Sequence, residues 1–114
     1  MTEPADAVAG AVVVMTTVAD RGDADRIAGA LVEARLAACV QCLTGVRSTY
    51  RWAGRVEQAE ECLLLVKTAA DRADAVATWL RAQHPYELPE ILVVEARGGL
   101  SGYLEWVHRE TRPL

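Results

Sequence analysis

The side chains with the most chemistry lie in one short segment, residues 84–90, with the sequence HPYELPE. The segment contains one of the two histidines of the chain, two of its four prolines, a tyrosine and two glutamates. Imidazole and carboxylate groups bind divalent cations and also transfer protons. Each proline holds the residue before it out of the α region, so a helix that arrives from the N-terminal side ends near His84. The segment is predicted to be a rigid corner that presents these groups; the alternative is a stiff connection with solvated charges.

His84 with Glu87 or Glu90 is a candidate metal site. One imidazole with carboxylates suits Cu(II), Ni(II) or Zn(II), and a neighbouring subunit can supply further ligands in an oligomer. The alternative is a histidine that is hydrogen-bonded at a subunit boundary. A lone histidine does not decide between the two.

Lys67 ends an apolar strand and is the cation expected beside this corner. A cleft between subunits that includes this lysine is predicted to hold a small anion or metabolite. The side chains predicted to line that cleft are Tyr50, Trp52, Lys67, Tyr86 and Glu90. The alternative for Lys67 is an ion pair with Glu87 or Glu90.

Cys39 and Cys42 have the spacing of a zinc knuckle. Residues three apart in a strand point to opposite faces, and no second pair completes four ligands, so we expect neither a zinc site nor a disulfide between them. Cys39 is a candidate ligand to a metal held by His84 and Glu90, or a nucleophile with His84 as its base. A small buried hydrophobe is the interpretation we favour for Cys39.

Composition indicates one globular domain and excludes several partners. The 114 residues are 52% hydrophobic and 25% charged, with a net charge of −4. This charge, with no basic cluster among aromatic residues, argues against nucleic acid as a partner. No apolar run has the length of a membrane span, and the N-terminus lacks the features of a signal peptide. We therefore expect no membrane partner and a cytoplasmic location, where the three cysteines stay reduced.

Hydrophobic periodicity predicts the elements that position these side chains. Residues 1–9 are expected to form a flexible tail and residues 10–114 a single domain. The predicted elements are a strand at 11–18, a helix capped by Asp20 and ending at 36–38, strands at 39–52 and 56–68 around a reversal at 53–54, a helix capped by Asp71 whose inner stripe continues to His84, a buried strand at 91–94, and a short helix at 100–109.

This order, β-α-β-β-α-β with an added C-terminal helix, predicts an α+β ferredoxin-like fold: a four-stranded antiparallel sheet with two helices on one face. The other face of the sheet needs cover. The half of the hairpin near its turn is too polar for a core, yet it carries Tyr50 and Trp52. Such a ribbon with open edges favours pairing with another chain, so we expect an oligomer.

Several motifs together resemble the divalent-cation-tolerance (CutA) family. They are AACV at 37–40, YRWAG at 50–54, LLLVKT at 63–68, HPYELPE at 84–90 and YLEW at 103–106. The resemblance covers residues 12–107. It implies a cytoplasmic homotrimer, built like the PII-type signalling trimers and linked to tolerance of copper and other divalent cations. It implies sites between subunits and no enzymatic reaction.

Some positions depart from the family pattern. Thr16 stands where some members have Cys, and Gln83 where some have a second His; both are candidate copper ligands there. The resemblance therefore implies weaker copper binding in this chain than in those members. Gln41, Cys42 and Thr44 replace the more usual Asn, Ile and Pro, which we interpret as structural changes.

Three functions remain open from the sequence. The first is a trimeric protein that binds copper or another divalent cation. The second is a PII-like signalling or binding module that takes a small ligand between subunits; the absence of a glycine-rich phosphate loop argues against nucleotides. The third, which has the least support, is an enzyme that uses His84, Glu90 and Tyr86 as acid–base groups.

Overall fold

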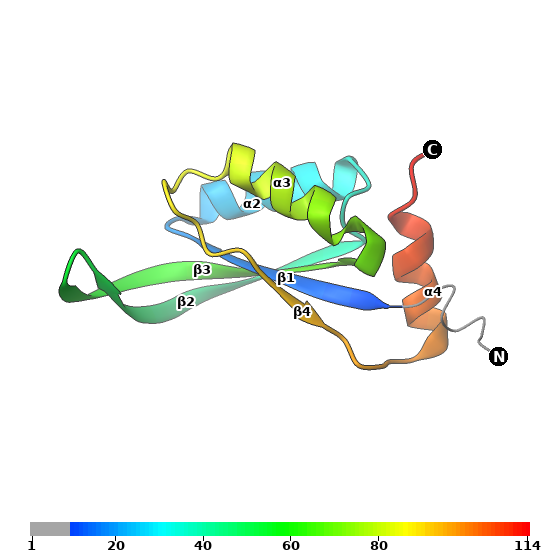
Figure 1. Cartoon of the computed structure of the whole chain (residues 1–114). Coiled ribbons are helices and arrows are strands. Elements are labelled where there is room, and N and C mark those ends of the chain that lie inside the picture. The colour runs from blue at the N-terminus through cyan, green and yellow to red at the C-terminus, as the bar shows by residue number, and fades with distance from the viewer. Residues whose placement is uncertain (1–9) are drawn as a thin grey trace.

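The computed structural model describes residues 10–114 as one antiparallel sheet with two helices on one face and a third helix at one end (Figure 1). The predicted tail, residues 1–9, lies outside the described residues. The elements are β1 (Ala11–Val18), α2 (Arg21–Glu33), β2 (Cys39–Trp52), β3 (Arg55–Ala69), a 3₁₀ turn η1 (Ala70–Arg72), α3 (Ala73–Gln83), β4 (Leu92–Glu95) and α4 (Ser101–Glu110). The predicted order of strands and helices is confirmed.

The sheet has the strand order β2-β3-β1-β4, which is the split βαβ arrangement predicted from the sequence. Alternate residues of β1 and β3, such as Val14 and Leu64, point toward the helices and are fully buried. Ile27 and Leu31 of α2 and Leu80 of α3 pack against them in one hydrophobic cluster. This core fixes the position of both helices over the sheet, and with them the loops that leave each helix.

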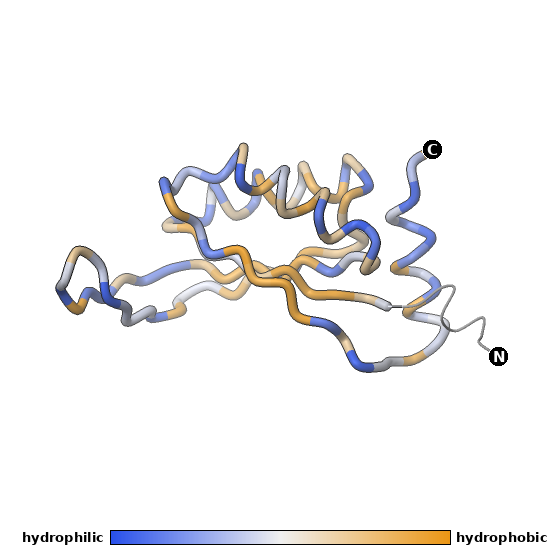
Figure 2. The backbone as a smooth tube through the Cα atoms, in the orientation of Figure 1, coloured by the Kyte–Doolittle hydropathy of each residue, from blue (hydrophilic) through white to orange (hydrophobic). Residues whose placement is uncertain are grey.

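The β2–β3 hairpin extends well beyond the rest of the sheet as a twisted ribbon (Figure 1). Its outer part is mostly hydrophilic, in contrast to the apolar centre of the sheet (Figure 2). A β-bulge shifts the register between Leu43 and Val46, so even-numbered residues of β2 change faces there. Ala53 and Gly54 both have positive φ, as a tight two-residue reversal requires. Tyr50 and Trp52 are therefore displayed on an outlying ribbon.

The expected burial of the fourth strand is wrong. β4 is an edge strand, and its residues Leu92, Val93 and Val94 are 56%, 47% and 49% exposed. Ile91, just before the strand, packs against the core. An apolar run predicts that a strand is buried, but it does not show whether the same chain or another one buries it. This strip is available to a second copy of the chain.

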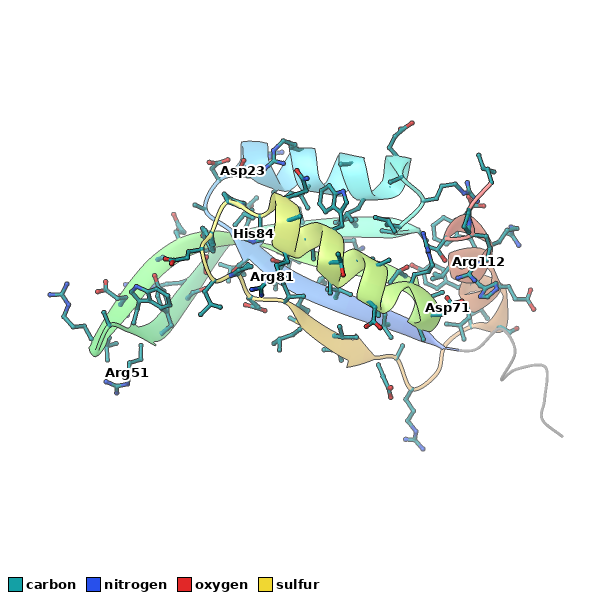
Figure 3. The ribbon with its side chains drawn as sticks, turned by 45° about the horizontal axis from the view of Figure 1, so that its top comes forward. Asp23, Arg51, Asp71, Arg81, His84 and Arg112 are labelled. Atoms are coloured by element: carbon teal, nitrogen blue, oxygen red, sulfur yellow. The ribbon has the colours of Figure 1, made fainter. Side chains whose placement is uncertain are left out.

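Asp71 does not cap the second helix as expected. The chain forms η1 first, and the residue before α3 is Arg72, which makes no side-chain capping bond. The Asp71 carboxylate instead binds the guanidinium group of Arg112, with one N–O distance of 2.7 Å (Figure 3). Asp20 caps α2 as predicted, since its Oδ1 accepts a hydrogen bond from the Asp23 amide at 2.8 Å.

An acidic aromatic pocket as the candidate functional site

His84 ends α3 and points inward, as the helical stripe predicted (Figure 3). Its Nδ1 accepts a hydrogen bond from the Tyr86 amide at 3.0 Å. Its other nitrogen, Nε2, therefore carries the proton and donates to the Thr17 carbonyl at 2.9 Å. Burial lowers the pKa of His84, which favours this neutral form. With both ring nitrogens engaged, the imidazole holds the corner against the end of β1 and has no lone pair free for a metal.

The corner places Tyr86 on the hairpin. The Tyr86 hydroxyl donates to Oε2 of Glu61 at 2.7 Å, and the rings of His84 and Tyr86 are 4.9 Å apart. Burial, and then the hydrogen bond to Glu61, raise the pKa of Tyr86. The phenol therefore stays protonated at neutral pH and fixes the orientation of a carboxylate that is itself only 8% exposed.

These groups border a cavity of about 730 Å³ between the corner and the hairpin. We call it the acidic aromatic pocket. Its lining residues are Thr17, Ser48, Thr49, Tyr50, Trp52, Ala59, Glu61, Tyr86, Glu87, Leu88, Pro89 and Glu90. Three of these are glutamates and none is lysine, arginine or histidine. The pocket therefore presents negative charge and aromatic surface together.

Four of the five residues predicted to line a cleft do line this pocket: Tyr50, Trp52, Tyr86 and Glu90. Lys67 does not. It lies opposite Val13 on β1, whereas the pocket begins at Thr17, whose partner on β3 is Leu63. Four residues of strand separate the two positions, about 13 Å. Within residues 10–114, no ion pair joins Lys67 to Glu87 or Glu90 either.

The predicted metal ligands His84, Glu90 and Cys39 are not brought together within one chain. Cys39 lies opposite Lys67, at the far end of the sheet from the corner. Within the described residues, no three His, Cys, Asp or Glu side chains are grouped as a metal site requires. Cys39 is half-buried, and the three thiols of the described chain are free.

Glu61 is a pocket residue that the sequence did not reveal. It belongs to the run Glu57–Glu61, which reads as a solvated strand. The bulge in β2 places Val46 opposite Glu61, and the corner folds back over the carboxylate. Strict alternation through 39–52 gave no sign of the bulge, although Gly45, with positive φ, was the available signal.

Thr16 and Gln83, the two departures from the family pattern, both lie outside the pocket. Thr16 is fully buried on the helix-covered face, and its Oγ1 has no hydrogen-bond partner among the described residues. Gln83 is exposed at the end of α3. Neither side chain lines the pocket as this chain is folded.

Comparisons with known proteins agree with this architecture. A family model described as CutA1 divalent ion tolerance protein matches residues 12–110. The chain is 45% identical over 102 residues to the divalent-cation tolerance protein CutA of Pectobacterium atrosepticum, covering 90% of this chain and 93% of that protein. It is 38% identical over 101 residues to the chloroplastic protein CutA 1 of Oryza sativa, covering 89% of this chain and 57% of that protein.

A solved structure is similar throughout. The crystal structure of CutA from the bacterium Xylella fastidiosa superposes with a TM-score of 0.88 at 42% identity, covering 91% of this chain and all of that one. The residues that the family model matches, 12–110, include every residue of the pocket. Within residues 10–114, none of the helices has the length and apolar character needed to cross a membrane.

Proposed function

Since the chain belongs to the CutA1 divalent ion tolerance family, we propose that it binds divalent cations in the acidic aromatic pocket and contributes to tolerance of them. The observation that carries this proposal is the charge of the pocket. Glu61, Glu87 and Glu90 line it, and no cationic side chain does. Carboxylate, phenol and carbonyl oxygens are ligands for divalent cations, whereas the three carboxylates repel an anion.

The site is half-built in one chain, and we propose that a homotrimer completes it. A cation requires more ligands than one chain gathers, and oligomers place further ligands at symmetric interfaces. Two features support assembly: the exposed apolar strip Leu92–Val94 and the aromatic ribbon with Tyr50 and Trp52. A second copy that pairs with these open strands would close the pocket from its outer side.

Oxygen donors determine which cations the site favours. They suit Mg(II), Ca(II) and Mn(II) better than Cu(II), which prefers imidazole nitrogen. For His84 to bind Cu(II), it would have to give up its bond to the Tyr86 amide or to the Thr17 carbonyl. We therefore propose that this pocket binds copper more weakly than Mg(II), Ca(II) or Mn(II), although copper was the metal that the resemblance implied.

A small organic ligand is the second candidate. A volume of about 730 Å³ exceeds what one ion needs and falls in the range of small-molecule sites. Because Lys67 lies elsewhere, the ligand would be cationic or neutral and would stack on Tyr50 or Trp52. This keeps the PII-like binding function but replaces the expected anion.

The proposal is binding rather than catalysis. A general acid or base works best with a pKa near the operating pH. The raised pKa of Tyr86 and the lowered pKa of His84, with both His84 nitrogens bonded, do not favour proton transfer. We also propose a cytoplasmic location, which the three unpaired thiols support.

Calorimetric titration of Mn(II), Zn(II) and Cu(II) into the purified protein tests the proposal. Glu61→Gln keeps an acceptor for the Tyr86 hydroxyl but removes the charge, and Glu105→Gln on α4 removes an exposed charge outside the pocket. We expect Glu61→Gln to weaken cation binding at least tenfold, about 1.4 kcal/mol, and Glu105→Gln to leave it unchanged. Equal binding by both variants would show that the pocket is not the site.

A further inference from the structure

Cys42 and Cys62 face each other on the helix-covered side of the sheet. Cys42 lies opposite Leu64 in the β2–β3 ladder, so the two share a face, and Cys62 is two residues from Leu64 on that same face. The pair therefore lies on the other side of the sheet from Glu61, the neighbour of Cys62. Because of the bulge after Leu43, Tyr50 and Trp52 also lie on the other face of the sheet from Cys42.

The two thiols are diagonal neighbours in the β2–β3 ladder, and one of them is open to solvent. Burial raises the pKa of Cys42, and the charge of Cys62 and a hydrogen bond between the two side chains raise it further. Asp25 and Arg21 of α2 also act on Cys42, with opposite signs. Cys42 is exposed, whereas Cys62 is only 6% exposed and belongs to the core cluster. An ion from solvent can therefore reach the sulfur of Cys42, whereas the sulfur of Cys62 is held in place by the core.

The spacing of this pair suits a bridging atom better than a direct bond. Diagonal neighbours across two antiparallel strands have Cα atoms roughly 7–8 Å apart. A disulfide needs Cα atoms within about 7 Å and Cβ atoms within about 4.5 Å, so it would require the backbone to move. A metal ion between two sulfurs, with metal–sulfur bonds of about 2.3 Å, spans roughly 4.6 Å between them and is compatible with diagonal neighbours on one face of the sheet.

We propose that Cys42 and Cys62 form a two-coordinate site for a soft monovalent ion, Cu(I). Thiolates select Cu(I), and a linear two-sulfur site needs no third ligand, in agreement with the lack of larger ligand clusters within residues 10–114. On binding, both S–H bonds lose their protons to solvent and two sulfur–copper bonds form, with no change in oxidation state. The complex acquires a single negative charge, which Arg21 of α2 stabilises and Asp25, the larger influence on Cys42, opposes.

The site differs from the acidic aromatic pocket in place and chemistry. The pocket offers oxygen ligands to divalent cations, whereas this pair offers sulfur to a monovalent one. A protein with both would take up copper in its reduced form without using His84. Glu61→Gln is expected to leave Cu(I) binding intact, so the two proposals fail separately.

Anaerobic competition between the intact protein and a chromophoric Cu(I) chelator measures this binding. We expect one Cu(I) per chain in the wild type and in Cys39→Ser, the control that removes the third thiol, three residues before Cys42 on β2 and on the opposite face of the sheet. Cys42→Ser, at an exposed position, is expected to lose at least a hundredfold in affinity. X-ray absorption at the copper edge should show two sulfur ligands.

The proposal is overturned if Cys42→Ser binds Cu(I) as the wild type does, or if Cys39→Ser loses as much. It is also overturned if mild oxidation reduces the thiol count from three to one through a Cys42–Cys62 disulfide, because the two Cα atoms would then lie within the reach of a direct sulfur–sulfur bond. Cys62→Ala gives a second test, with circular dichroism to confirm its fold.

Discussion

Removing the Tyr86 hydroxyl should destabilise the protein by an amount that the structure allows to be bounded. The hydroxyl donates at 2.7 Å to Glu61, whose side chain is buried. Hydrogen bonds to charged groups contribute about 1.5–3 kcal/mol to stability. Tyr86 is half-buried, so we expect Tyr86→Phe to cost about 1.5–2 kcal/mol at neutral pH.

Urea unfolding at a fixed protein concentration is the assay, because the stability of an oligomer depends on concentration. With m of about 1–3 kcal/mol/M, the midpoint should fall by roughly 1 M. Tyr50→Phe is the matched control: it removes the same atom from the same pocket, and within residues 10–114 no hydrogen bond of the Tyr50 hydroxyl is found. We expect its effect to stay below about 0.5 kcal/mol.

A double-mutant cycle with Glu61→Ala isolates the contact. If the two side chains act on each other, the cycle should give a coupling energy of about 1 kcal/mol or more. The reasoning is refuted if Tyr86→Phe matches Tyr50→Phe, or if the coupling energy is near zero. Either result would mean that Glu61 is oriented by something other than the phenol.

Four further predictions test other parts of the account. The pKa of His84 is lowered in the folded chain, so as the pH falls the unfolded chain binds a proton at this histidine before the folded chain does. The free energy of unfolding should therefore be greatest above about pH 6.5 and fall below it. Urea unfolding at several pH values should show this slope, and His84→Gln should make the slope smaller. Light scattering should give three times the mass of one chain for the wild type and a smaller mass for Val94→Lys, since Val94 lies on the uncovered strip; an unchanged mass would exclude that strip from the interface. Arg112→Ala should cost about 1 kcal/mol or less by urea unfolding, since its ion pair with Asp71 is exposed; a loss above 2 kcal/mol would contradict this. Thiol titration of the unfolded, unreduced protein should count three free thiols, and a count of one would contradict the structure.

Periodicity predicted the order of the elements because each helix and strand has one face that must be buried. It also placed His84 inward, four residues after Leu80 on the same stripe. Periodicity wrongly placed Lys67 beside the corner, because it does not give the direction in which a helix runs over the sheet. α3 starts beside the end of β3 and runs back along the sheet for 11 residues, about 16 Å. The corner therefore lies at the opposite end of β3 from Lys67.

Two features of the site depend on contacts that no local pattern contains. Glu61 is enclosed only because a bulge in β2 resets the register and Tyr86 reaches it from a segment 25 residues later. The nitrogens of His84 are occupied by a carbonyl 67 residues away and by the next-but-one amide. A sequence shows a histidine beside carboxylates, but only the fold shows that its lone pair is already used.

The central claim, that the acidic aromatic pocket binds divalent cations, is tested most directly by locating the ion. Crystals grown with Mn(II) should show an anomalous scattering peak among the oxygens of Glu61 and Glu90, with a neighbouring subunit completing the coordination, and the peak should vanish in Glu61→Gln. A strong peak at His84 or Cys39, or a peak that survives in Glu61→Gln, would contradict the account.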